Sequence, residues 1–201
     1  MIRQWSSENL IRIYTDKLTH LYGFLSKFAI VMTVRKATYG DIPRIMEICS
    51  EARSIMRSDR NMSQWTGGYP SKDVILNDID NAVGYVIGDG GIDGYFAFIP
   101  GIEQTYLKIE NGSWLDDSLP YCTIHRLAST KDSHGIAQTC FDWGWQRCRN
   151  LRIDTHEDNR IMRHCIEKFG FIFCGVIHLL NGDPRLAYQK IETSNGSQQS
   201  A

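Results

Sequence analysis

From residue 33 onward, the sequence alternates short apolar runs, typical of strands, with stretches whose apolar residues recur every three or four positions, as in helices. In chain order, the pattern predicts a strand, two helices, three strands, a helix, a strand, a helix and two final strands. Strands separated by helices are thus combined with strands that follow one another directly. This order favours an α/β domain built around one mixed sheet.

Turn residues mark the ends of several predicted elements. Asp89, Gly90 and Gly91 form a strong hairpin signal between the strands expected at 84–87 and 93–99. Gly170 is expected to end a helix in the left-handed conformation. The other expected strands are 34–37, 121–129, 151–155, 171–177 and 185–190, and the expected helices begin near 41, 72, 135 and 158. The last helix is expected to turn five apolar residues inward, namely Ile161, Met162, Cys165, Ile166 and Phe169.

The two ends of the sequence differ from this pattern. We expect residues 1–31 to form an N-terminal extension, 32–191 the folded domain, and 192–201 a polar, disordered tail. Two interpretations of the extension stay open: an amphipathic helix that packs on the domain, or a segment that precedes a natural start at Met32. The apolar run at 21–32 contains Lys27 and is shorter than the ~20 residues that span a bilayer, so we expect no membrane anchor.

Charge and cysteine content narrow the function classes. The formal net charge is −1 at pH 7, and acidic and basic residues are mixed along the chain. The basic stripe of a nucleic-acid-binding protein is missing, so we expect no nucleic-acid partner. The six cysteines form no CxxC pair and lie in apolar segments, where free cysteines usually behave as small buried residues. They favour a reduced, cytoplasmic protein.

The segment 127–137 runs from a strand through a turn into a helix, with Gly135 at the bend. Free backbone N–H groups and the positive end of a helix meet at such a turn, which suits a pyrophosphate. On this segment alone, close packing of the glycine explains the sequence equally well.

A second motif agrees with this turn. Asn159 opens the next helix, and Glu167, Lys168, Gly170 and Phe171 follow at the spacing of a signature in which Asn precedes Glu-Lys-x-Gly-Phe. The two motifs together resemble the GNAT superfamily of acetyl-CoA-dependent N-acetyltransferases over about residues 34–190. The resemblance implies a GNAT-like α/β fold, with a mixed sheet of about seven strands flanked by about four helices.

The resemblance also implies a binding mode for acetyl-CoA. The cofactor would enter a V-shaped gap between the strands at 121–129 and 151–155, with its pantetheine arm paired to the first strand like an added strand. The turn amides would hold the pyrophosphate, and Asn159 would reach a pantetheine amide. The expected cofactor-binding residues are Leu127, Ala128, Ser129, His134, Gly135, Ile136, Ala137, Gln138, Thr139 and Asn159. GNAT proteins often dimerise, so a homodimer stays open.

Two positions depart from the family pattern. Asp132 stands where an Arg or Gln usually precedes the motif glycine, and its charge disfavours a nearby pyrophosphate. Ile166 stands where many relatives carry a Tyr that protonates the departing thiolate. A thiol of pKa about 8.5 is a tolerable leaving group, so this acid is useful rather than obligatory. Tyr106, Cys165 or a water molecule could supply the proton.

His125 is the expected general base. Direct transfer to an amine requires the removal of a proton from an ammonium group. Side-chain alternation places His125 on the strand face of Tyr121, Thr123 and Leu127, and its ordinary pKa of about 6.5 suits proton transfer. Arylalkylamine acetyltransferases carry a His at the similar position. The alternative is a core histidine bonded to a carbonyl, while Arg126 is expected to point away in a structural role.

Acceptor recognition is expected from loops, where binding residues concentrate. Trp65, Glu103 and Trp114 are the expected substrate-binding residues, because aromatic rings and a carboxylate suit a cationic amine. We expect the acceptor to be a primary amine of a small molecule or peptide. The two tryptophans could equally cover edges of the core.

Three other interpretations of the sequence compete with this enzyme. Asp132 and Ile166 motivate a catalytically weak GNAT-like module that binds acyl-CoA as a sensor or partner. An unrelated nucleotide-binding fold would require a GxGxxG or P-loop motif after the first strand, and neither occurs there. Asp154, His156 and Asp158 alternate near a strand end, but their spacing fits no common zinc or iron site. We therefore expect capping and solvent-facing roles for them, and no metal.

Overall fold

The computed structural model describes residues 32–192, so the predicted extension and residues 193–201 of the predicted tail lie outside the described residues. Seven strands and four α-helices follow one another in the described part. They are β1 (Thr33–Lys36), α2 (Ile42–Ser58), α3 (Lys72–Asp80), β2 (Gly84–Gly88), β3 (Gly94–Pro100), β4 (Cys122–Ser129), α4 (Ile136–Arg147), β5 (Asn150–Thr155), α5 (Arg160–Lys168), β6 (Ile172–His178) and β7 (Pro184–Ile191).

The seven strands form one sheet in the order β1-β2-β3-β4-β5-β7-β6. β4 and β5 are parallel, while the other five neighbouring pairs are antiparallel. A parallel pair needs a crossover connection, and α4 supplies it. The mixed sheet and its flanking helices confirm the α/β fold predicted from the sequence.

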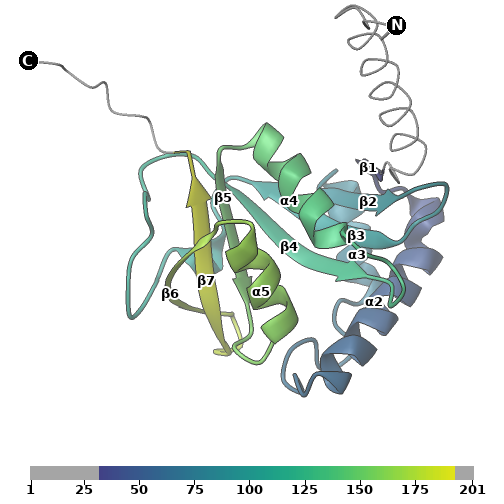
Figure 1. Ribbon diagram of the computed structural model, residues 1–201, viewed down its shortest axis with the longest axis horizontal. Coiled ribbons are helices and arrows are strands. Elements are labelled where there is room, and N and C mark those ends of the chain that lie inside the picture. The colour runs from purple at the N-terminus through teal and green to yellow at the C-terminus, as the bar shows by residue number, and fades with distance from the viewer. Residues whose placement is uncertain (1–31, 193–201) are drawn as a thin grey trace, which may run out of the picture. The chain divides into compact units, whose positions relative to one another are not determined.

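The helices cover both faces of the sheet (Figure 1). On one face, Ile136 and Phe141 of α4 and Ile166 of α5 pack with Ile124 and Leu151 of the central strands. On the other face, α2 and α3 pack through a second cluster that includes Ile45, Ile48, Ile75, Val86 and Tyr95. A third cluster lies where the segment between β3 and β4 covers β6 and β7, and contains Tyr106, Trp114, Tyr121, Cys174, Ile177 and Ala187. The sheet therefore buries side chains on both sides.

Element boundaries differ from the prediction by one or two residues. The strand expected from 121 begins at Cys122, and the helix expected to begin near 158 begins at Arg160. One inward assignment in α5 is wrong, because Ile161 is 50% exposed. The stripe formed by Met162, Cys165, Ile166 and Phe169 packs on the sheet, and Ile161 lies outside it. Gly170 adopts the expected left-handed conformation, with φ of +87°.

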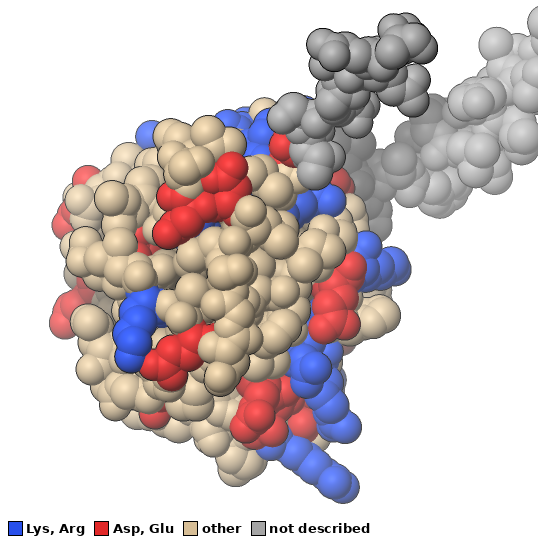
Figure 2. Space-filling view, turned by 90° about the vertical axis from the view of Figure 1, so that its left-hand side faces the viewer, with Lys and Arg blue, Asp and Glu red and all other residues tan. Residues whose placement is uncertain are grey.

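The surface carries both signs of charge. Figure 2 is turned to show the side of the molecule where β6 and β7 lie, and there Lys and Arg are interspersed with Asp and Glu. Within residues 32–192, every helix is too short or too polar to cross a lipid bilayer.

A largely buried ion pair joins α3 to β4. Asp78 is 1% exposed, and its two carboxylate oxygens accept hydrogen bonds from Nε and Nη2 of Arg126 at 2.8 and 2.6 Å. The hydroxyl of Tyr95 donates to the same carboxylate at 2.6 Å. A carboxylate with three close donors fixes the conformation of β4 at Arg126.

We predict that Asp78→Ala destabilises the protein by about 3–5 kcal/mol, because removal of one partner leaves a largely buried charge unpaired. Asp80→Ala is the matched control on the same helix. Asp80 accepts only the hydroxyl of the exposed Tyr39 among the recorded side-chain bonds, so we expect a change within about 0.5 kcal/mol. Urea unfolding of both variants measures the difference, and equal losses would contradict the role given to Asp78.

Candidate active site

The parallel strands β4 and β5 separate before they end. Their residues pair at Cys122 with Leu151, Thr123 with Arg152 and Ile124 with Ile153, and the pairing stops there. β4 nevertheless continues to Ser129 and β5 to Thr155, each still paired with its outer neighbour. Two strand edges with unpaired backbone groups therefore face one another in the middle of the sheet, as the V-shaped gap requires.

A β-bulge in β4 accompanies this separation. Tyr95 of β3 lies opposite Ala128 and Ala97 opposite His125, so Phe96 faces two residues of β4. One of them, Arg126, has a φ of +59°, in the left-handed region that non-glycine residues rarely adopt. The bulge bends and twists the strand away from its straight path.

The bulge corrects two expectations about side-chain direction. Leu127 packs with Cys122 and Ile124 on the α4 face, so the expectation that it shares a face with His125 is wrong. Arg126 lines the cavity described below, so the expectation that it points away is also wrong, although Asp78 holds its guanidinium. One additional residue shifts the alternation of every side chain that follows.

A cavity of about 530 Å³ opens where the two strands separate. Its walls come from β4 and β5 where they separate, the segment between β3 and β4, the N-terminus of α5, the loop after α2 and the turn between β6 and β7. Five of the predicted site residues line it, namely Trp65, Glu103, His125, Leu127 and Asn159.

His125 lies between two carboxylates in this cavity. Its Nε2 is 3.2 Å from Oε2 of Glu103, and its Nδ1 is 3.6 Å from Oδ1 of Asp154. The hydroxyl of Tyr106 donates to the same Asp154 oxygen at 2.7 Å. The expectation of a capping and solvent-facing role for Asp154 is wrong, because its largely buried side chain lies beside His125. The position of Asp154 at the end of β5, next to the predicted gap, is the one sequence feature that could have placed it in the site.

The carboxylate of Glu103 is held in its charged form. The hydrogen bond from His125, followed by the charge of His125 and two hydrogen bonds from Thr105, lowers the pKa of Glu103 to about 2 against the opposing effect of burial. Tyr106 is affected in the other direction, because burial and the nearby Asp154 raise the pKa of its hydroxyl well above the usual value. Near neutral pH the cluster therefore presents a negative charge at Glu103 and a protonated hydroxyl at Tyr106.

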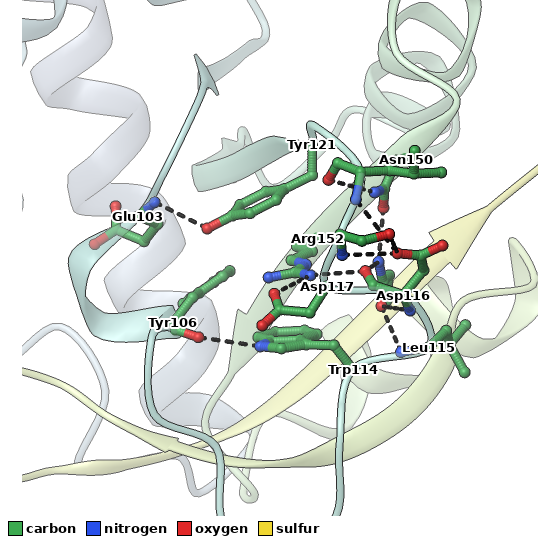
Figure 3. Close-up of polar contacts among 12 residues, drawn as sticks. Glu103, Tyr106, Trp114, Leu115, Asp116, Asp117, Tyr121, Asn150 and Arg152 are labelled. Carbon is green, nitrogen blue, oxygen red and sulfur yellow. Dashed lines mark hydrogen bonds and ion pairs between the residues drawn. The ribbon is translucent and has the colours of Figure 1, made fainter.

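Figure 3 shows a buried arginine, Arg152, between the rings of Tyr121 and Trp114 and next to the segment that carries Glu103 and Tyr106. The guanidinium of Arg152 is 4.0 Å from the ring of Trp114 and 3.9 Å from that of Tyr121, and it pairs with Asp117 at 2.8 Å. The hydroxyl of Tyr121 accepts a bond from the backbone N–H of Glu103 at 3.0 Å. The stacked guanidinium thus fixes the segment that carries Glu103.

Trp114 belongs to this support and not to the cavity wall. It is 7% exposed, and its indole N–H donates to the backbone carbonyl of Tyr106 at 3.0 Å. The structure therefore does not bring Trp114 to the cavity with Trp65 and Glu103. Tyr106 is also outside the wall, with 1% exposure, and contacts the site through Asp154.

The predicted pyrophosphate turn lies beside the cavity, at the start of α4. Gly135 occupies the N-cap position with φ of +79°, and no described side chain caps this helix end. The first-turn amides are therefore free to bind an anion. Ala128, Ser129, His134, Gly135, Ile136, Ala137, Gln138 and Thr139 all lie on this strand, turn and helix start, outside the wall of the cavity.

Comparison with solved structures decides the family. A GNAT-family acetyltransferase from Streptococcus agalactiae superimposes with a TM-score of 0.73 and 37% sequence identity, over 81% of this chain and 96% of that one. This chain belongs to the GNAT family of acetyltransferases. No protein-family model matches the sequence, and no curated protein matches it.

Two more distant solved structures share the fold alone. A GNAT-family acetyltransferase from Listeria monocytogenes matches with a TM-score of 0.61 and 16% identity, over 81% of this chain and 96% of that one. A ribosomal-protein-alanine N-acetyltransferase from Brucella melitensis matches with a TM-score of 0.53 and 15% identity, over 80% and 99%.

GNAT acetyltransferases generally use acetyl-CoA, and the residues of this cleft fit that molecule. The unpaired edge of β4 offers backbone donors and acceptors to an extended amide chain. Thr155, on the opposite wall, has a fully buried hydroxyl with no partner among the described residues. Such a group is costly to leave unpaired, so a polar ligand in the cleft is favoured. Within residues 32–192, no three His, Cys, Asp or Glu residues are grouped to hold a metal ion.

The lowered pKa of Glu103 predicts a pH effect on stability. Because its pKa in the folded protein is about 2, below the ordinary 4.5, the unfolded chain binds more protons between these values. The stabilisation from Glu103 is present above pH 4.5 and is lost as the pH falls towards 2. Thermal melts between pH 5 and pH 2 should therefore fall more steeply for the wild type than for Glu103→Gln, and parallel curves would contradict the Glu103–His125 contact.

Proposed function

We propose that this chain transfers the acetyl group of acetyl-CoA directly to a primary amine of a small molecule or peptide. Membership of the GNAT family supports acetyltransferase activity. The observation that carries the proposal is the placement of His125 between Glu103 and Asp154, at the mouth of the gap between β4 and β5. These groups form a place to hold an ammonium ion and remove its proton.

Acetyl-CoA supplies the acetyl group in the activated form of a thioester. We infer that the backbone of β4 at Leu127 and Ser129 pairs with the pantetheine amides, because this strand edge is unpaired. The free amides at the start of α4 hold the pyrophosphate. Asn159 and Thr155 provide side-chain hydrogen bonds from the opposite wall.

The acceptor amine binds as an ammonium ion beside Glu103, whose carboxylate stays charged at neutral pH. When the ammonium ion pairs with Glu103, it replaces the hydrogen bond from Nε2 of His125 to this carboxylate. Asp154, fixed by Tyr106, then favours the His125 tautomer with its proton on Nδ1, so that the lone pair of Nε2 faces the ammonium ion. Nε2 then accepts a proton from the ammonium ion, and the freed nitrogen lone pair attacks the thioester carbonyl. The new C–N bond forms, the C–S bond breaks, and the sulfur leaves as a thiolate. The amide nitrogen releases its second proton to water as the thiolate departs.

The residue that protonates this thiolate is not Tyr106 in our proposal. Its hydroxyl donates to Asp154 and is fully buried, so Tyr106 acts as a positioning residue. Ile166, at the position where many relatives carry a Tyr, is also buried and has no proton to give. We infer that water protonates the thiolate, because a thiol of pKa about 8.5 leaves readily near neutral pH.

Calorimetry and kinetics together test this function. We predict that the wild type binds acetyl-CoA and CoA in the micromolar range and releases thiol when supplied with acceptor amines. His125→Ala should keep CoA binding but lose at least about 100-fold in turnover, the usual contribution of a general base. His178→Ala, at an exposed position at the end of β6, is the matched control and should keep both.

Each other outcome separates the alternatives. CoA binding without turnover in the wild type, over a broad panel of amines, favours a module that only binds acyl-CoA. No CoA binding contradicts the proposed acetyl-CoA dependence. Full turnover in His125→Ala contradicts the role of His125 as the base.

A further inference from the structure

The loop after α2 is joined to the start of α5 by two side-chain contacts. Nδ2 of Asn159 donates to Oε1 of Gln64 at 2.9 Å, and Arg160 pairs with Asp59 at 2.8 Å. α2 packs on β3 and β4, on one side of the gap, whereas α5 follows β5 on the other side. These contacts therefore connect the two walls of the cleft.

The side-chain amide of Asn159 makes two recorded hydrogen bonds, one that caps α5 and one that joins α5 to the loop after α2. Its Oδ1 accepts from the N–H of Met162 at 3.1 Å and so caps α5, which fixes the direction of the amide group. Its Nδ2 donates one hydrogen to Gln64, and the second hydrogen is free for a ligand in the cavity that Asn159 lines. Gln64 thus holds the amide that the proposed cofactor would contact.

The same glutamine also belongs to the wall on the acceptor side. Oε1 of Gln64 accepts a second bond from Nδ2 of Asn61 at 2.9 Å. Arg57 donates to the backbone carbonyls of Gln64 and Trp65 at 2.9 and 3.3 Å.

Trp65 depends on these restraints. It has a φ of +55°, a left-handed conformation that a bulky residue adopts only when its surroundings enforce it. Its ring stands edge-on to Tyr69, with ring centres 6.1 Å apart, and both residues line the cavity. Any change at Gln64 therefore reaches the aromatic wall.

We propose that Gln64 is a positioning residue that couples the cofactor wall to the acceptor wall. The proposal rests on the function proposed above, in which acetyl-CoA contacts Asn159. When a ligand carbonyl accepts the second Asn159 hydrogen, the amide of Asn159 becomes less mobile. Through its bonds to Asn159 and Asn61, Gln64 then restricts the motion of Trp65 and the rest of loop 61–69. The acceptor then binds to a loop already ordered, so the two ligands strengthen each other's binding.

Two substitutions of Gln64 separate its acceptor function from its size. Every recorded side-chain bond of Gln64 uses Oε1 as the acceptor, so Gln64→Glu keeps both bonds. Gln64→Met has a similar length but loses them. Arg160→Ala is the matched control, since it removes the neighbouring contact between the same two segments and Arg160 does not line the cavity.

The readout is hydrogen–deuterium exchange of peptides that cover 61–69, measured with and without CoA. We expect CoA to slow exchange in the wild type, Gln64→Glu and Arg160→Ala, but not in Gln64→Met. The acetyl-CoA dissociation constant of Gln64→Met should rise about 2- to 10-fold, as expected for one hydrogen bond. Melting temperatures of all variants check that each is folded.

The outcomes distinguish this proposal from the proposed function. Equal CoA-dependent slowing in Gln64→Met and the wild type overturns the coupling alone. Loss of the slowing in Arg160→Ala and Gln64→Glu as well as Gln64→Met also overturns it, since the effect would then not depend on the Gln64 acceptor. Absence of CoA binding by the wild type in calorimetry overturns the proposed function, and the coupling with it.

Discussion

The site depends on the separation of two parallel strands that lie side by side at only three positions. β4 and β5 pair as far as Ile124 and Ile153, and the bulge at Arg126 then bends β4 away. The left-handed conformation of Arg126 is unfavourable by itself, and the buried carboxylate of Asp78 holds its side chain in place. A single ion pair between α3 and β4 therefore maintains the bend, and with it the unpaired strand edges.

The separation of β4 and β5 also determines which side chains meet in the site. His125 is the first residue of β4 past the last paired position, and Asp154 is its counterpart on β5, so the two side chains meet at the mouth of the gap. Glu103 approaches from the segment between β3 and β4. Arg152 anchors this segment, because its guanidinium is stacked between the rings of Trp114 and Tyr121. A histidine between two carboxylates, beside unpaired backbone groups, supports the proposed transfer of an acetyl group to an amine by this GNAT acetyltransferase.

The sequence predicted the parts that obey regular periodicity. Apolar spacing located the seven strands and four helices of the described residues, and the Asn159 motif indicated the family. Irregular backbone geometry could not be predicted from the sequence. Strict alternation cannot anticipate the bulge that moves Leu127 to the other face, and Ile161 has the apolar character of a core residue despite its exposure. Contacts between segments far apart in the sequence could not be predicted either. Trp114 was therefore expected at the acceptor, although it packs on Tyr106, and Asp154 was expected at the solvent, although it lies beside His125.

A crystal structure of the protein with CoA is the most direct test of this account. The account predicts that the pantetheine arm lies between β4 and β5, with its amides bonded to the backbone of Leu127 and Ser129 and its pyrophosphate at the start of α4. The thiol should then end near His125 and Glu103. A complex in which CoA binds elsewhere, or in which β4 and β5 pair along their full length, would contradict it.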